Sequence, residues 1–247
     1  MMNTKLNKFL MVGFFILGSI MPTYAIDGPE GQTSDEPTFE NHDYYGIGGD
    51  DSYPIFNTTP PENHVLTRRA SVTEQAWAGD GITRFYQDDI PDSYKCIGGT
   101  PVKDVGCTIT SYAMVLSKYG YYREPQYVFE DLKRTGGVGA DCNMIWNPSA
   151  VSAAYPGIIM EHSYNDGLKE SVAMQKIEGI LKTGKPVIVG MHKLGDHDTH
   201  YVVCYGYEKY SDGGVFHYIF NPQKGRADTL EGYMANWYIE TFTMLYR

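Results

Sequence analysis

Apolar side chains recur every three or four positions in a stretch that follows Gly106, which is the spacing of one face of a helix. The stretch begins at Cys107 and ends at Gly120, a residue type that commonly ends helices, so a helix of about three turns is predicted there. Further helices are predicted over 125–133 and 168–184. The apolar positions of the first helix are Ile109, Tyr112, Ala113, Leu116 and Tyr119.

The pattern changes after Gly184 from helical spacing to short runs of β-branched and aromatic residues, which are typical of strands. Four strands are predicted, over 186–191, 200–207, 215–220 and 237–246. Helices thus come first and an antiparallel sheet second. This order predicts an α+β domain whose N-terminal helical part packs on one side of a small sheet or half-barrel.

The first 25 residues have the features of a secretory signal peptide. Lys5 and Lys8 precede an uncharged apolar run over 9–21, and a small residue, Ala25, offers a cleavage site. The run is shorter than the ~20 apolar residues of a membrane span. We therefore expect a secreted or periplasmic protein that is free of the membrane once residues 1–25 are removed.

An acidic, Gly- and Pro-rich segment over 26–76 follows. Nine acidic residues and no Lys or Arg lie between Ile26 and Leu66, and this composition predicts a largely disordered stretch. It is read as a linker or, because the dibasic pair Arg68 and Arg69 follows, as a pro-segment. A single folded domain is predicted over 77–247. Outside the acidic stretch the charge is nearly balanced, which argues against a nucleic-acid partner.

Cys107 is the first candidate for chemistry. A thiol becomes a useful nucleophile when its pKa is lowered, and the positive end of a helix dipole favours the thiolate. Taken alone, a cysteine at a helix start is more often a buried structural residue or half of a disulfide. The assignment therefore depends on partners elsewhere in the chain.

His200 and Asn221 are those candidate partners. His200 begins one predicted strand, and Asn221 ends the next, where Pro222 stops the ladder. If the two strands are neighbours, the Asn221 amide can hold the imidazole in the tautomer needed for proton transfer. An Asx-type turn is the structural alternative for Asn221. Alternation puts His200 on one strand face with Val202 and Cys204, and the other face carries Tyr201, Val203 and Tyr205.

A histidine-rich hairpin offers a competing metal site. Its possible ligands are His192, Asp196, His197, Asp198 and His200. No helix fixes a ligand pair there, and the spacings typical of zinc sites are absent. Neither a metal nor another cofactor is therefore expected. Two further histidines, His162 and His217, are expected to be surface or satisfied polar residues.

Four blocks in the right order resemble the peptidase C39-like family of the papain-like superfamily. They are GCTITSYAMVL at 106–116, GKPVIV at 184–189, HYVV at 200–203 with GY at 206–207, and NP at 221–222. The resemblance covers roughly Gln87 to the C-terminus. It implies a papain-like fold with catalytic Cys107, His200 and Asn221, and with Gln87 helping to bind the oxyanion.

The implied activity is that of an exported cysteine peptidase or amide hydrolase, which acts on a peptide or protein substrate through an acyl-enzyme. With Cys107 assigned to chemistry, Cys96 and Cys142 are the expected disulfide because both lie in loop-like sequence, and Cys204 is expected to be a buried free thiol. Two alternatives stay open, a catalytically inactive papain-like binding module and a cell-wall amidase or transpeptidase. The sequence leaves the oligomeric state open.

Overall fold

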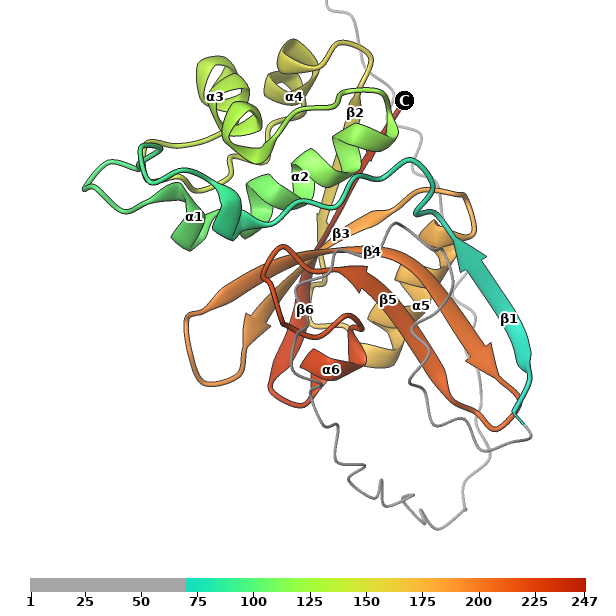
Figure 1. Cartoon of the computed structure of the whole chain (residues 1–247). Helices are drawn as coiled ribbons and strands as arrows, with labels where there is room; N and C mark the ends of the chain where they lie inside the picture. Colours follow the sequence, from blue (N-terminus) through green and yellow to red (C-terminus); the bar gives the residue numbers. More distant parts are fainter. Residues whose placement is uncertain (1–69) are drawn as a thin grey trace, which may run out of the picture. The chain divides into compact units, whose positions relative to one another are not determined.

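The computed structural model describes residues 70–247, so the predicted signal peptide and all but the end of the acidic segment lie outside the described residues. In this part of the chain, one strand is followed by a 3₁₀ turn and four helices, and the other strands come after them (Figure 1). The helices are α1 (Val102–Val105), α2 (Cys107–Lys118), α3 (Pro125–Thr135), α4 (Pro148–Ala154), α5 (Glu170–Leu181) and α6 (Glu231–Met234), with a 3₁₀ turn η1 (Gln87–Asp89). The strands are β1 (Val72–Trp77), β2 (Ile159–Tyr164), β3 (Val187–Lys193), β4 (Thr199–Tyr210), β5 (Val215–Phe220) and β6 (Trp237–Tyr246).

All strand pairings in the described sheet are antiparallel, and the order is β1-β4-β3-β6-β2, with β5 paired to β4. Strand β4 is the centre of this arrangement because its twelve residues pair with three other strands. The pairing with β5 matches Val203 with Phe220. The end of β5, and Asn221 after it, is thereby brought to the start of β4.

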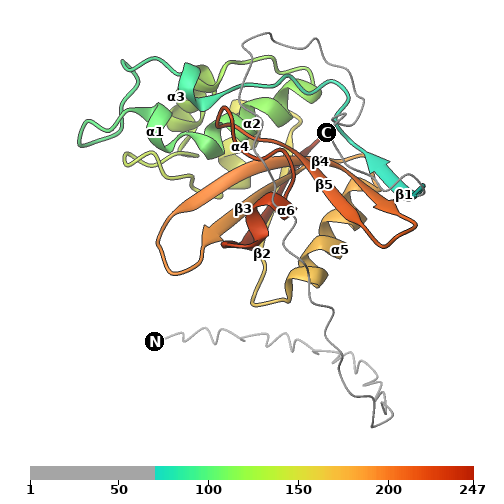
Figure 2. The same cartoon turned by 60° about the horizontal axis from the view of Figure 1, so that its bottom comes forward.

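Helices cover both faces of the sheet, so the prediction that the helical part packs on one side holds for α1 to α4 and is wrong for α5. Helices α1 to α4 lie together on one side, and α5 lies on the other, as the two views in Figures 1 and 2 show. The side chains divide accordingly: Val203 packs with α2, whereas Val202 and Cys204 pack with α5. The predicted alternation along β4 is confirmed, and so are the mixed α+β class and the antiparallel sheet.

The predicted helices match the structure closely. Helix α2 begins at Cys107 and is followed by Gly120, whose φ of 87° is the left-handed conformation that glycine adopts without strain. Helix α3 begins with Pro125 at its first turn, where the missing N–H costs nothing, and ends two residues later than predicted. Helix α5 falls within the predicted range of 168–184.

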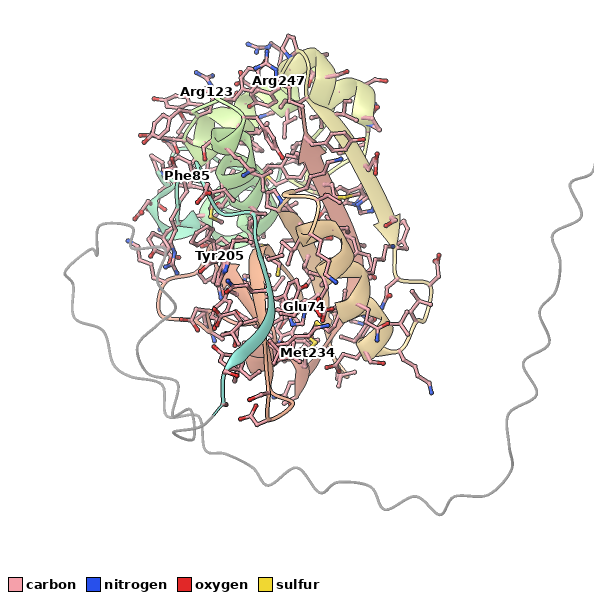
Figure 3. The ribbon with its side chains drawn as sticks, turned by 90° about the vertical axis from the view of Figure 1, so that its right-hand side faces the viewer. Glu74, Phe85, Arg123, Tyr205, Met234 and Arg247 are labelled. Atoms are coloured by element: carbon pink, nitrogen blue, oxygen red, sulfur yellow. A yellow bond between two sulfur atoms is a disulfide. The ribbon has the colours of Figure 1, made fainter. Side chains whose placement is uncertain are left out.

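Two strands were not predicted. Strand β1 pairs with the far half of β4, so the folded part begins earlier than the predicted boundary at residue 77 (Figure 3). Strand β2 lies between α4 and α5 and pairs with β6, so the helices do not all precede the sheet. Both are six-residue strands that pair on one side only, and their mixed polar and apolar residues lack the run typical of a buried strand.

In residues 70–247, no helix has both the length and the apolar character needed to cross a bilayer.

Replacement of Gly206 by Ala should weaken the joint between β1 and β4. A Cβ atom at residue 206 would lie 2.2 Å from Cε3 of the Trp77 ring, so the ring and its strand must shift. We expect a loss of about 1–3 kcal/mol in the free energy of unfolding, measured by denaturant titration. Gly179→Ala is the matched control, because nothing lies within 4 Å of the added methyl on α5 and the helix gains propensity. Equal stability of the two variants would contradict this packing.

Candidate functional site

Cys107 begins helix α2, and Gly106 is the N-cap residue before it. Helix α1 ends directly ahead of this glycine. A Cβ atom at residue 106 would lie 2.6 Å from the carbonyl oxygen of Val102, closer than real side chains come. Glycine at this position therefore lets α1 pack directly behind the predicted nucleophile.

The N-terminal half of α2 is held against the start of β4. Ser111 Oγ donates a hydrogen bond of 3.2 Å to the carbonyl oxygen of Tyr201, and the Tyr201 backbone is close enough to the Cys107 sulfur to lower the pKa of its thiol. Tyr201 directly follows His200 in β4. The structure thus brings the predicted nucleophile to the residue next to its predicted base.

The Cys107 side chain is nearly enclosed, with 8% of the residue exposed. Burial raises the pKa of its thiol, and hydrogen bonds from the Tyr201 backbone and from Thr108 offset this only in part. Burial therefore opposes the thiolate that the helix N-terminus is expected to favour. At neutral pH Cys107 is a thiol.

His200 lies second in β4 and is 4% exposed. Its Nε2 lies 3.0 Å from Asn221 Oδ1. The rings of Tyr233 and Trp237 enclose the imidazole, with centroid distances of 5.7 and 6.3 Å. Burial lowers the pKa of His200, the hydrogen bond to Asn221 raises it, and the nearby Arg226 cation lowers it further. The net direction is downward, so the imidazole is neutral at pH 7.

Asn221 is fully buried, and all the hydrogen-bonding groups of its side chain are used. Its Nδ2 donates to the carbonyl oxygen of Ala227 at 3.0 Å and to the Tyr233 hydroxyl at 2.5 Å. Its Oδ1 accepts from the Gln223 backbone N–H at 3.0 Å, so the alternative Asx-type turn is present too. These bonds orient the amide with its oxygen toward His200.

The orientation of that amide determines the tautomer of the imidazole. Because Asn221 presents an acceptor, His200 Nε2 carries the proton and donates it. The lone pair is then on Nδ1, the nitrogen that can accept a proton. His200 is thus held as a neutral base.

Gln87 connects the two halves of the site. It lies in η1, is 4% exposed, and donates from its backbone N–H to the carbonyl oxygen of Pro222, the residue after Asn221, at 2.9 Å. Its side-chain Nε2 donates to the carbonyl oxygen of Lys103 in α1 at 2.9 Å. Gln87 lies twenty positions before Cys107 in the sequence, but these bonds tie it to α1, the short helix just before Cys107, and to the residue after Asn221.

The intervening loop folds back on itself, which explains this proximity. Lys95 and Pro101 form an isolated antiparallel bridge, and the Cys96–Cys142 disulfide ties the loop to the segment after α3. The predicted disulfide is confirmed. Cys204 is buried and free, as predicted, and Cys107 is also a free cysteine.

The histidine-rich hairpin does not assemble as a metal site. Lys193 binds the carboxylates of Asp196 and Asp198 at 3.0 and 3.4 Å, and His200 is turned to Asn221 instead. Among residues 70–247, no group of three or more His, Cys, Asp or Glu side chains is placed to hold a metal. His217, expected to be a surface or satisfied residue, is 1% exposed and bound to Glu231.

Tyr233 and Trp237 are site residues that the sequence analysis missed. They come from α6 and the start of β6, close to one another in the chain. A short aromatic cluster before the last strand was the available signal. Nothing in the spacing of these aromatic residues shows that they lie beside the start of β4 and the end of β5 in the fold.

The chain belongs to the peptidase C39-like family, because the family model matches residues 80–243. The matched range contains Gln87, Cys107, His200 and Asn221. Membership of this family indicates a hydrolase of peptidase type. No curated protein matches the chain.

The pKa of His200 should govern the acid limb of Cys107 reactivity. Burial lowers that pKa from 6.5, so the base stays available below this pH and is lost only as the pH falls through the lowered value. We expect the rate of Cys107 alkylation by iodoacetamide to have its acid limb below pH 6.5. Asn221→Ala removes the bond that raises this pKa and should move the limb lower still. An acid limb above pH 6.5, or an acid limb that Asn221→Ala does not move, would contradict the assignment of His200 as the base.

Proposed function

We propose that the protein is an exported cysteine peptidase or amide hydrolase with a papain-like fold, acting through an acyl-enzyme on Cys107. The observation that carries this proposal is the buried hydrogen bond between His200 and Asn221, beside a thiol at the start of a helix. The α2 layer packed on an antiparallel sheet supports the fold assignment. The match to the peptidase C39-like family supports the reaction class.

In the first step, the Cys107 sulfur attacks the carbonyl carbon of the scissile amide, and His200 Nδ1 takes the thiol proton. A C–S bond forms, and the carbonyl π electrons move to the oxygen. The thiol and imidazole are both neutral at rest, so charge separates only as attack proceeds. The Asn221 oxygen stabilises the imidazolium that results.

The tetrahedral intermediate then collapses. The oxyanion electrons re-form the carbonyl, the C–N bond breaks, and the imidazolium gives its proton to the leaving amine. A water molecule repeats the sequence on the thioester: His200 takes its proton, the oxygen attacks, and the sulfur leaves and recovers that proton. The products are an amine and a carboxylic acid, with the free enzyme restored.

The oxyanion is held by the backbone N–H of Cys107 and by the side-chain amide of Gln87. One N–H of Gln87 Nε2 is bound to the Lys103 carbonyl, which anchors the amide beside α1. The second N–H of the same NH₂ group is the donor assigned to the oxyanion.

Export is proposed from the signal-like N-terminus and is supported by the Cys96–Cys142 disulfide, a bond typical of oxidising compartments. Sequencing the N-terminus of the protein recovered outside the cytoplasm tests it. A start at Ile26 is expected, and recovery of the intact chain from the cytoplasm alone would contradict export.

A thiol-reactive peptide probe should label Cys107 and depend on His200. Removal of the base is expected to slow labelling by about 10²–10⁴-fold in His200→Ala. His197→Ala, in the exposed hairpin, is the matched control and should label like the parent protein. Cys204 is fully buried and should stay unlabelled. An equal labelling rate of Cys107 in the parent protein and in His200→Ala would favour the alternative of an inactive binding module.

Gln87→Ala should separate acyl transfer from simple thiol reactivity. Acylation by a peptide ester develops an oxyanion, whereas alkylation by iodoacetamide does not. Loss of one oxyanion donor should therefore lower the acylation rate by about 10²–10³-fold. Alkylation of Cys107 should change by much less, and both rates are measured on the same preparation. An equal loss in both would assign Gln87 to the packing of α1 instead.

A further inference from the structure

Short helix α6 delivers one side chain to the buried amide of Asn221. The Tyr233 hydroxyl accepts the second N–H of Asn221 Nδ2 at 2.5 Å, while the first goes to the Ala227 carbonyl. Burial raises the pKa of Tyr233, so the hydroxyl keeps its proton. The hydrogen bond between Asn221 and Tyr233 is therefore one between two uncharged groups.

We infer that Tyr233 is a positioning residue for the His200–Asn221 pair. Asn221 is fully buried, so an N–H that loses its acceptor there has no water to replace it. The amide would turn or tilt to recover a partner, and its oxygen would then move out of line with His200 Nε2. The hydroxyl of Tyr233 thus supports the hydrogen bond between Asn221 and His200, although the hydroxyl is not itself a partner in that bond.

The ring of Tyr233 restrains the imidazole as well. Its centroid lies 5.7 Å from that of His200 at an interplanar angle of 34°. Trp237 stands edge-on to Tyr233 at 5.9 Å and closes the third side of the cluster. One residue therefore contacts both members of the pair, His200 by its ring and Asn221 by its hydroxyl.

Helix α6 has only four residues, too few to be stable without tertiary contacts. Its first residue, Glu231, accepts from the backbone N–H of His217 at 3.0 Å and binds the His217 ring at 2.6 Å. His217 lies in β5, the strand that ends just before Asn221. Tyr233 and Asn221 are thus both tied to β5, Tyr233 through the bonds of Glu231 to His217 and Asn221 through the chain itself.

Gly232 permits the close approach of α6 to the turn after β5. A Cβ atom there would lie 2.8 Å from the Ala227 Cβ, next to the carbonyl that binds Asn221. Both acceptors of the Asn221 amide are therefore built into one packed unit.

This inference rests on the proposed function, because its readout is the His200-dependent reactivity of Cys107. The test measures the pH profile of iodoacetamide alkylation in the full chain for Tyr233→Phe, Asn221→Ala and the double variant. Tyr233→Phe should lower the neutral-pH rate about tenfold, the equivalent of one ordinary hydrogen bond. It should also move the acid limb to lower pH, as Asn221→Ala does, because the imidazolium loses support.

The double variant should match Asn221→Ala to within about twofold, since the hydroxyl then has no amide to hold. Tyr238→Phe, at a 45% exposed tyrosine of β6, is the control and should leave the profile unchanged. Additive losses, or an unmoved acid limb in Tyr233→Phe, would overturn the inference. Absence of His200-dependent reactivity in the parent protein would instead overturn the proposed function.

Glu231→Gln is a second variant that weakens the anchor of α6 and keeps the Tyr233 hydroxyl. Glu231→Gln should shift the acid limb in the same direction as Tyr233→Phe, by a smaller amount. It serves as the test in place of Tyr233→Phe if thermal unfolding shows that Tyr233→Phe is unfolded at the assay temperature. An unchanged profile in Glu231→Gln would then overturn the inference.

Discussion

Helix α2 meets strand β4 at Tyr201. The carbonyl oxygen of Tyr201 accepts a hydrogen bond from the Ser111 hydroxyl, and its backbone lies close to the Cys107 sulfur. Every other part of the site is placed relative to this contact. It brings the thiol beside the strand that carries His200, and β4 in turn pairs with β5, so Asn221 arrives at the same place. A shift of α2 along β4 would separate the thiol from the hydrogen-bonded pair of His200 and Asn221.

The site combines two opposing electrostatic effects. Enclosure disfavours both the thiolate of Cys107 and the imidazolium of His200, so the resting pair is neutral. In the proposed reaction, the same enclosure would strengthen each hydrogen bond that supports the developing charges, because little water competes. The buried amide of Asn221 is useful for this reason, although it does not itself exchange a proton.

Much of the fold was predictable because local signals agree with the final structure. The apolar spacing from Cys107 to Gly120 and the β-branched runs after Gly184 each match the period of their element. Asn221 could be brought to His200 because consecutive strands usually pair. Strand β1 and Tyr233 were missed because their positions depend on contacts across the whole sheet. The state of the Cys107 thiol also depends on burial, which sequence position does not reveal.

The Cys96–Cys142 disulfide closes a covalent ring that contains all of α2 and α3, and therefore Cys107 itself. A ring closed over a sequence separation of 46 lowers the entropy of the unfolded chain, which stabilises the fold by about 4 kcal/mol in the loop-entropy model. Redox conditions thus act on the protein in two opposite ways. A reductant that reverses oxidation of Cys107 also attacks the bond that encloses its helix. The reducing power that can be used to restore the Cys107 thiol is therefore limited by the stability that the disulfide gives to the surrounding fold.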